Sequence, residues 1–279
     1  MNRFDLFLLR RAGLTNRQLL KVLAYQKQVS KKLPLRDIAV VSGCKDPVAF
    51  MERYKALDNV TCRQVFQQFP SFSINDGCYP DRLKEIYNPP VLLFYQGNLD
   101  LLTEPALAVV GARSAGPDGI RAVEKIVSEL DNRFTIISGL AKGIDSAAHK
   151  AAIRSGASTI GVVGCGLDRV YPVGNERLQA YMAKEHLVIS EYEAKTEPKK
   201  HHFPDRNRII AGLSQDVIVA QAKTRSGSLI TCERAMEEGR DVFAIPESIL
   251  DGQSDGCHHL IQEGAKCITS GQDILCEYV

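Results

Sequence analysis

The sequence lacks any feature of a membrane-bound or exported protein. No run of apolar residues approaches the roughly 18 that a membrane-spanning helix needs. The N-terminal apolar stretch is short, is interrupted by Asp5 and is followed by Arg10 and Arg11, which is unlike a secretory signal. We therefore expect a cytoplasmic protein with no membrane segment.

The sequence also lacks paired cysteines. Its 8 cysteines are scattered and none forms a C-x-x-C pair. Zinc sites need closely spaced ligands, and disulfide scaffolds are normally short secreted chains. We therefore expect reduced, mostly buried thiols, no metal site and no cofactor.

The sequence also lacks a large excess of charge of either sign. The chain has 35 Lys and Arg against 33 Asp and Glu, a formal net charge of +2. Many nucleic-acid-binding domains are strongly basic overall. A site for a polyanion in this chain must therefore be a local concentration of positive charge.

Residues 1–70 have the pattern of a small all-helical domain. Thr15 and Gln18 form a predicted capping box, and Thr61 and Gln64 form a second one. The pair Asp46-Pro47 has the order expected of a helix start. Support of the larger domain or contact with a partner is the default role for such a domain.

Residues 71–105 read as a connecting segment that packs on the large domain. They contain turn prolines and one strand-like run, VLLFY.

From residue 106 to 279, apolar runs alternate with glycine-containing turns and helical segments. Such alternation indicates a doubly wound α/β fold, Rossmann-like, with a mostly parallel sheet covered on both faces. Ligands of these folds bind outside the carboxyl ends of the strands. The expected strands are 106–110, 134–138, 158–163, 187–190, 216–220, 241–245 and 266–269.

Several turns after these strands suit an anion. Glycine lets backbone N–H groups approach a phosphate, a helix start adds partial positive charge, and arginine can bind phosphate with two N–H groups. Glycine is common in such turns, so each one alone is weak, whereas several at one sheet edge suit a run of phosphates. The candidate binding residues are Gly111, Ala112 and Arg113, then Gly139 and Lys142, and then Ser226, Gly227 and Ser228, which follow Arg225.

The segment 195–208 supplies the local charge that the whole chain lacks. It holds five Lys or Arg against two acids, with Phe203 among them. A base stacked on an aromatic ring gains about 1–3 kcal/mol, while neighbouring cations bind backbone phosphates. The alternative is that Phe203 only anchors a loop while the arginines pair with acids. The candidate residues are Lys200, Phe203, Arg206, Asn207 and Arg208.

The sequence offers little for catalysis. It has no dinucleotide fingerprint, which argues against a nicotinamide or flavin protein, no P-loop and no nucleophile paired with a base. A Rossmann-like nucleotide phosphoribohydrolase is the alternative function. Its P-G-G-x-G-T-x-x-E signature would fall on residues 225–233, which keep Glu233 and lack the paired glycines.

Six ordered blocks resemble the DNA-processing protein A (DprA/Smf) family. They are VVGARSAG, SGLAKGIDSAAHKAAI, TIGVVGCGLDRVYP, the turn SEY, HFPDRNRIIAGLS and RSGSLITCERAMEEGRDVFAIP. The resemblance covers most of residues 70–279, and the helical N-terminus resembles the sterile-alpha-motif-like domain of some members. It implies a non-enzymatic protein of natural transformation, which binds and protects incoming single-stranded DNA and loads the RecA recombinase onto it.

The resemblance also implies site residues. The family's G-(S/A)-R turn falls on residues 111–113, and its basic-then-aromatic motif falls on Lys200, Phe203, Arg206 and Asn207. Both coincide with the residues chosen above.

Three further points follow from the resemblance. The family forms homodimers, and that surface would lie near Met236 and the stretch from Cys257 to Cys267, which includes His258. Val173 stands where some relatives place a lysine that helps to hold DNA. Many members carry a C-terminal winged-helix domain, which we do not expect here because the sequence ends at Val279.

Overall fold

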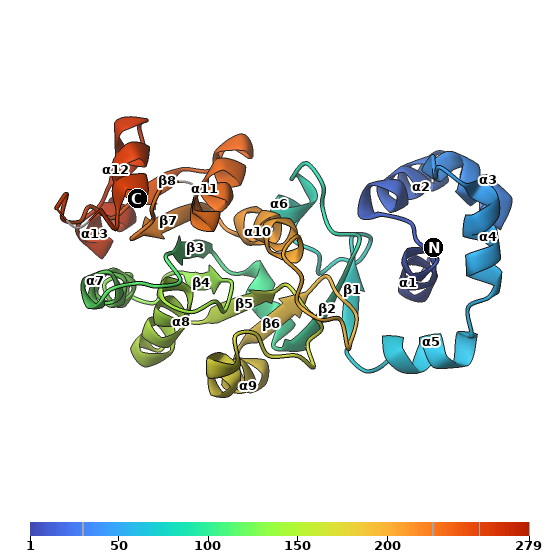
Figure 1. Cartoon of the computed structure of the whole chain (residues 1–279), viewed down its shortest axis with the longest axis horizontal. Coiled ribbons are helices and arrows are strands. Elements are labelled where there is room, and N and C mark those ends of the chain that lie inside the picture. The colour runs from blue at the N-terminus through green and yellow to red at the C-terminus, as the bar shows by residue number, and fades with distance from the viewer. Residues whose placement is uncertain (30, 225, 251, 279) are drawn as a thin grey trace.

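The computed structural model describes residues 1–29, 31–224, 226–250 and 252–278. These residues form a nine-stranded sheet in the order β1-β2-β6-β5-β4-β3-β7-β8-β9, with a group of helices beyond its β1 edge (Figure 1). The strands are β1 (Ser71–Ser73), β2 (Leu92–Gly97), β3 (Ala106–Gly111), β4 (Thr135–Ser138), β5 (Thr159–Val163), β6 (Leu187–Ser190), β7 (Asp216–Ala220), β8 (Val242–Ala244) and β9 (Lys266–Cys267).

The sheet is parallel from β6 to β9, and β2 pairs antiparallel with both β6 and β1. The predicted doubly wound, mostly parallel α/β fold with a helical N-terminus is confirmed. Each expected strand run from residue 106 onwards contains a strand. Residues 71–105 do more than connect, because they add β1 and β2 to the sheet.

Helices cover both faces of the sheet. One face carries α7 (Pro117–Ser128), α8 (Ile144–Ser155), α9 (Glu176–Glu185) and α13 (Gly271–Leu275); the other carries α6 (Asp81–Lys84), α10 (His202–Leu213), α11 (Gly227–Glu237) and α12 (Asp255–Gln262). Strand β3 shows why the run is apolar throughout. Ala108 and Val110 pack toward α10, whereas Leu107 and Val109 pack toward α8. Short 3₁₀ helices cover Leu99–Thr103, Val173–Asn175 and Cys276–Tyr278.

The helical module comprises α1 (Arg3–Arg11), α2 (Asn16–Val29), α3 (Leu35–Ser42), α4 (Pro47–Lys55) and α5 (Asn59–Phe66). The predicted capping box at Thr15 is confirmed, since its backbone N–H donates to the Gln18 side chain at 2.9 Å. Asp46 caps α4 as predicted, by accepting from the Ala49 N–H. The predicted box at Thr61 is wrong. Asp58 caps α5 instead, and Thr61 lies inside its first turn.

An aromatic cluster and buried charge join the module to the sheet. Phe7 and Phe66 pack against Phe94 of β2, with ring centroids 6.2 and 6.1 Å from it. Arg10 of α1 reaches the turn after β6, where its Nη1 donates to the Glu191 carbonyl oxygen at 2.7 Å. The module is therefore seated against the same turn that leads into α10.

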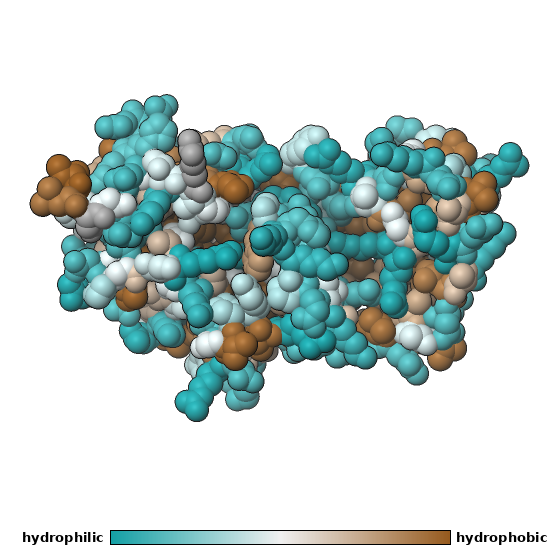
Figure 2. Space-filling model, in the orientation of Figure 1, coloured by the Kyte–Doolittle hydropathy of each residue, from teal (hydrophilic) through white to brown (hydrophobic). Residues whose placement is uncertain are grey.

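The face seen in Figure 2 is covered mainly by hydrophilic residues, with hydrophobic residues in small separate groups. Among the residues described, no helix is long and apolar enough to cross a membrane.

Candidate nucleic-acid interface

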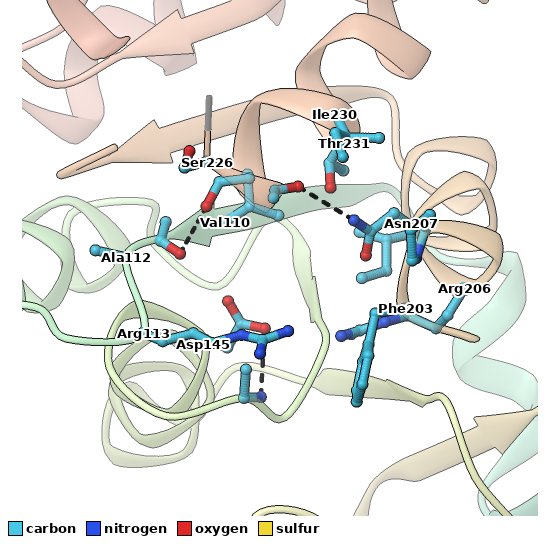
Figure 3. A pocket seen from close by; sticks show the side chains of 16 residues that line it. Val110, Ala112, Arg113, Asp145, Phe203, Arg206, Asn207, Ser226, Ile230 and Thr231 are labelled. Carbon is cyan, nitrogen blue, oxygen red and sulfur yellow. Dashed lines mark hydrogen bonds between the residues drawn. The ribbon is translucent and has the colours of Figure 1, made fainter. Parts of the chain in front are cut away.

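A pocket of about 420 Å³ opens where β3 ends, between α8, α10 and α11 (Figure 3). This is the sheet edge at which the fold class predicts a ligand. The pocket brings together nine of the predicted residues: Gly111, Ala112, Arg113, Phe203, Arg206, Asn207, Ser226, Gly227 and Ser228. Residues from three separate stretches of sequence therefore converge on one opening.

Arg113 lies on the turn after β3 and is exposed. Its guanidinium carbon lies over the Phe203 ring, 5.0 Å from the centroid, so the two side chains make a cation–π contact within the pocket (Figure 3). Within the described part of the chain Arg113 forms no ion pair at 4 Å or less. Its charge is therefore available to a phosphate.

Phe203 begins a helix rather than lying in a loop. It is the second residue of α10, half-buried, and its ring contacts Tyr171 as well as Arg113. The centroids of Tyr171 and Phe203 are 5.5 Å apart. Sequence reasoning missed Tyr171, although an aromatic residue shortly after the glycine turn 164–166 was a signal for it.

Arg206 lies beneath the pocket rather than at its rim. The side chain is 4% exposed, and Nη1 donates to the Val162 carbonyl oxygen at 2.9 Å. Burial lowers the pKa of this guanidinium, and the carboxylate of Asp145 opposes that shift. Arg206 therefore contributes a positive charge that is largely withdrawn from solvent.

Gly139 makes room for Arg206. A Cβ atom on Gly139 would lie 1.4 Å from Arg206 Nη1, so the packed side chain of Arg206 would have to move. Gly139 does not itself line the pocket. Its approach to a phosphate stays a prediction, and the structure shows in addition that Gly139 makes room for a buried side chain.

Asp145 lines the pocket and was also missed by sequence reasoning. Its Oδ2 accepts from the backbone N–H groups of Gly139 and Ala141 at 3.1 and 3.3 Å. Burial raises the pKa of this carboxyl group, while Arg206, the two N–H groups and Arg113 oppose the rise. The acid holds the turn after β4 closed and offsets one of the two arginine charges. A polar residue on the first turn of a helix was the available signal.

Hydrogen bonds connect the turn before α11 to its neighbours. Ser228 Oγ donates to the Gly111 carbonyl oxygen at 2.7 Å, and Asn207 Nδ2 donates to the Gly227 carbonyl oxygen at 3.3 Å. Ser226 lines the pocket, and its buried Oγ has no hydrogen-bond partner among the residues that the structure describes. Arg225 lies outside the described residues.

Three predicted cations lie outside the pocket. Lys142 and Lys200 are exposed and do not line it. Arg208 points away, with Nη1 donating to the Asn88 carbonyl oxygen and Nη2 to a Glu191 carboxylate oxygen, both at 2.5 Å. Arg208 therefore pairs with an acid, as the alternative interpretation of this segment expected for its arginines.

The residue required by the alternative enzyme also lies elsewhere. Glu233 is exposed on α11 and is not among the residues that line the pocket. The described residues contain no group of three or more His, Cys, Asp or Glu side chains placed to hold a metal ion.

Comparison with known proteins identifies the family. Residues 71–279 match the model of DNA recombination-mediator protein A, and residues 1–62 match that of the DNA processing protein A sterile alpha motif domain. The chain is 61% identical to DNA processing protein DprA of Streptococcus pneumoniae, over 99% of this chain and 98% of that one. The X-ray structure of the S. pneumoniae protein matches with a TM-score of 0.98, over 99% of this chain and 98% of that one.

More distant relatives agree. DNA processing protein DprA of Bacillus subtilis is 43% identical over 79% of this chain and 75% of its own length. The Helicobacter pylori protein, whose structure concerns its single-stranded DNA binding mode, matches with 30% identity and a TM-score of 0.68, over 76% of this chain and 96% of that one. With both parts of the chain matched and the resemblance confirmed, this protein belongs to the DNA recombination-mediator protein A family.

Proposed function

We propose that this protein binds single-stranded DNA in the pocket at the end of β3 and acts without catalysis. One observation carries the proposal: Arg113, which forms no ion pair among the described residues, lies over the ring of Phe203 in an open pocket. An arginine beside an aromatic ring provides for a phosphate and a base together. The H. pylori relative, with its single-stranded DNA binding mode, supports the same assignment.

The wider role is proposed from the family. In the cytoplasm during natural transformation, the protein would protect incoming single strands and load the RecA recombinase onto them. A strand-exchange assay tests the loading step. Addition of the protein should accelerate strand exchange on DNA already covered by a single-strand-binding protein, and an unchanged rate would contradict this part.

Direct binding is tested by fluorescence anisotropy. We expect a labelled oligothymidylate to bind more tightly than a duplex of the same length, because bases in a duplex are not free to stack on Phe203. Affinity for the single strand should fall as salt rises, by a slope of about 0.7 per phosphate contact. Equal affinity for both forms, or no dependence on salt, would contradict the proposal.

Two variants locate the site. Arg113→Ala should weaken binding and reduce the salt slope by about 0.7, since one phosphate contact is lost. Phe203→Ala should weaken binding by about 1–3 kcal/mol with little change in slope. The control is Arg154→Ala, which removes an exposed arginine that pairs with Glu124 outside the pocket. If Arg113→Ala behaves like the control, the pocket is not the site.

Lys142 and Lys200 are proposed as flanking contacts to the DNA backbone. Both are exposed, as counterion exchange with a strand requires. Each alanine variant should reduce the salt slope by less than Arg113→Ala does, because neither lysine lines the pocket.

We propose a homodimer whose surface includes Met236, His258 and Cys267. Met236 and Cys267 are exposed, and β9 is an edge strand of the sheet. Light scattering of Met236→Glu should then give a smaller particle than the parent protein.

We also propose that residues 1–70 form a separate helical domain, joined through 71–105 to the DNA-binding part, 106–279. Limited proteolysis should cut first near residue 70.

A further inference from the structure

We propose that Tyr171 is a second base-stacking residue, which continues the DNA path from Phe203 over the loop 164–175. The inference rests on the proposed binding of single-stranded DNA. It assigns to that loop an unpaired nucleobase as ligand, in place of the phosphate that a lysine at position 173 would bind.

The ring of Tyr171 is placed to receive a base. It lies 5.5 Å from Phe203 between centroids, at an interplanar angle of 40°, and it is 44% exposed. Because the two rings already contact one another, no base fits between them. Tyr171 instead offers the surface that faces away from Phe203 to a further nucleotide. Arg113 lies over Phe203 at 5.0 Å, so arginine, phenylalanine and tyrosine form one continuous row.

Hydrogen bonds hold the loop in this place independently of the Tyr171 ring. Asn175 Nδ2 donates to the Leu140 carbonyl oxygen at 2.7 Å and to Ser146 Oγ at 2.8 Å. Gln179 Nε2 donates to the Arg169 carbonyl oxygen at 2.9 Å. The loop is therefore tied to the turn after β4, which borders the pocket. A large aromatic ring held in position but left half in solvent is the arrangement used to stack bases.

The charge on the loop points to a base rather than a phosphate. Arg169 is its one cation in the sequence, and that side chain pairs with Glu197 at 3.0 Å. Val173 is 78% exposed and carries no charge. Stacking, which tolerates any base, is then the contact that this loop can make.

The test compares two labelled oligonucleotides of equal length in anisotropy titrations, one of thymidylate and one with abasic sites throughout. Tyr171→Ala should weaken binding of oligothymidylate by about 5- to 150-fold, the factor for about 1–3 kcal/mol per stacked base. Binding of the abasic strand and the salt slope should stay as in the parent protein. Tyr171→Phe should retain the parent affinity, because it keeps the ring.

Tyr181→Ala serves as the matched control, since Tyr181 is similarly exposed but lies on α9 against His186. An equal loss of affinity for both oligonucleotides with Tyr171→Ala, or no loss for either, would overturn the proposal. If Arg113→Ala and Phe203→Ala still weaken binding in that case, the proposed function stands and only the role of Tyr171 fails. If those variants also bind like the parent protein, the proposed function fails with it.

A second variant tests the path itself. Val173→Lys places a cation beside the proposed row, and we expect the salt slope to steepen by about 0.7 as one more phosphate is engaged. An unchanged slope would mean that the strand does not pass over this loop, and would overturn the path.

Discussion

The carboxylate of Glu191 holds three parts of the molecule together, and its removal is a direct test of the architecture. Its Oε2 accepts from Arg208 of α10 at 2.5 Å, and its Oε1 lies 3.4 Å from Arg10 of the helical module. Glu191 itself belongs to the turn after β6. The side chains of Glu191 and Arg208 are 4% and 13% exposed, so their charges are almost entirely withdrawn from water.

The magnitude follows from this burial. Loss of one partner from a buried ion pair destabilises a protein by about 3–5 kcal/mol, because the remaining charge is left without compensation. Arg10 is more exposed than Arg208 and adds at most about 1 kcal/mol. Glu191→Gln keeps the shape and some hydrogen bonding, so we expect a loss of about 3 kcal/mol. At about 2–4 °C per kcal/mol, the melting temperature should fall by about 6–12 °C.

Thermal unfolding followed by circular dichroism measures the effect. The matched control is Glu237→Gln, which breaks an exposed pair with Arg234 on α11 and should change stability by about 0.5 kcal/mol at most. A Glu191→Gln melting temperature equal to that of the control would refute the view that this carboxylate neutralises a buried arginine. The guanidinium of Arg208 would then be available to bind a DNA phosphate.

The remaining predictions concern single positions. Burial lowers the pKa of His149 to about 3, so below the unfolded value of about 6.5 only the unfolded chain gains this proton. Stability should then fall by about 1.4 kcal/mol per pH unit below 6.5, and less steeply in His149→Asn, as pH-dependent melts will show. Gly139→Ala should cost about 3–5 kcal/mol in the same melts by displacing Arg206. Gly227→Ala, whose Cβ would meet no atom of the described residues within 4 Å, should change stability by about 0.5 kcal/mol at most. Asp58→Ala should cost about 1 kcal/mol through loss of the α5 cap.

The strands could be predicted because a strand that is buried on both faces appears in the sequence as an uninterrupted apolar run. Residues 106–110 are apolar without a break, which is what a parallel strand covered by helices on both faces requires. The ends of short helices were harder. Thr61 and Gln64 fit a capping pattern, but Asp58 precedes them and caps both the Val60 and Thr61 N–H groups. When two candidate N-cap residues lie three positions apart, sequence spacing alone does not tell which of them caps the helix.

In the site, too, one part could be predicted from the sequence and another could not. Proximity of the three turns followed from the rule that strand ends of one sheet share an edge, and the pocket confirms it. Side-chain direction did not follow. Arg206 and Arg208 are two positions apart in sequence, yet one lies under the pocket floor and the other binds Glu191. On a helix, residues two apart point to different sides, so a run of cations does not form one surface.

The burial of Arg206 also explains how a nearly neutral chain can hold a polyanion. A buried guanidinium contributes positive potential to the pocket, and salt screens it far less than it screens an exposed charge. A side chain that is 4% exposed does not neutralise a phosphate by direct contact, so Arg206 displaces no condensed counterion from the DNA. The salt slope should therefore count Arg113 and the flanking lysines and omit Arg206. Replacement of Arg206 by methionine should accordingly lower affinity by a similar factor at low and high salt, whereas the effect of Arg113→Ala should shrink as salt rises. Parallel salt dependences for the two variants would show that Arg206 reaches the strand itself.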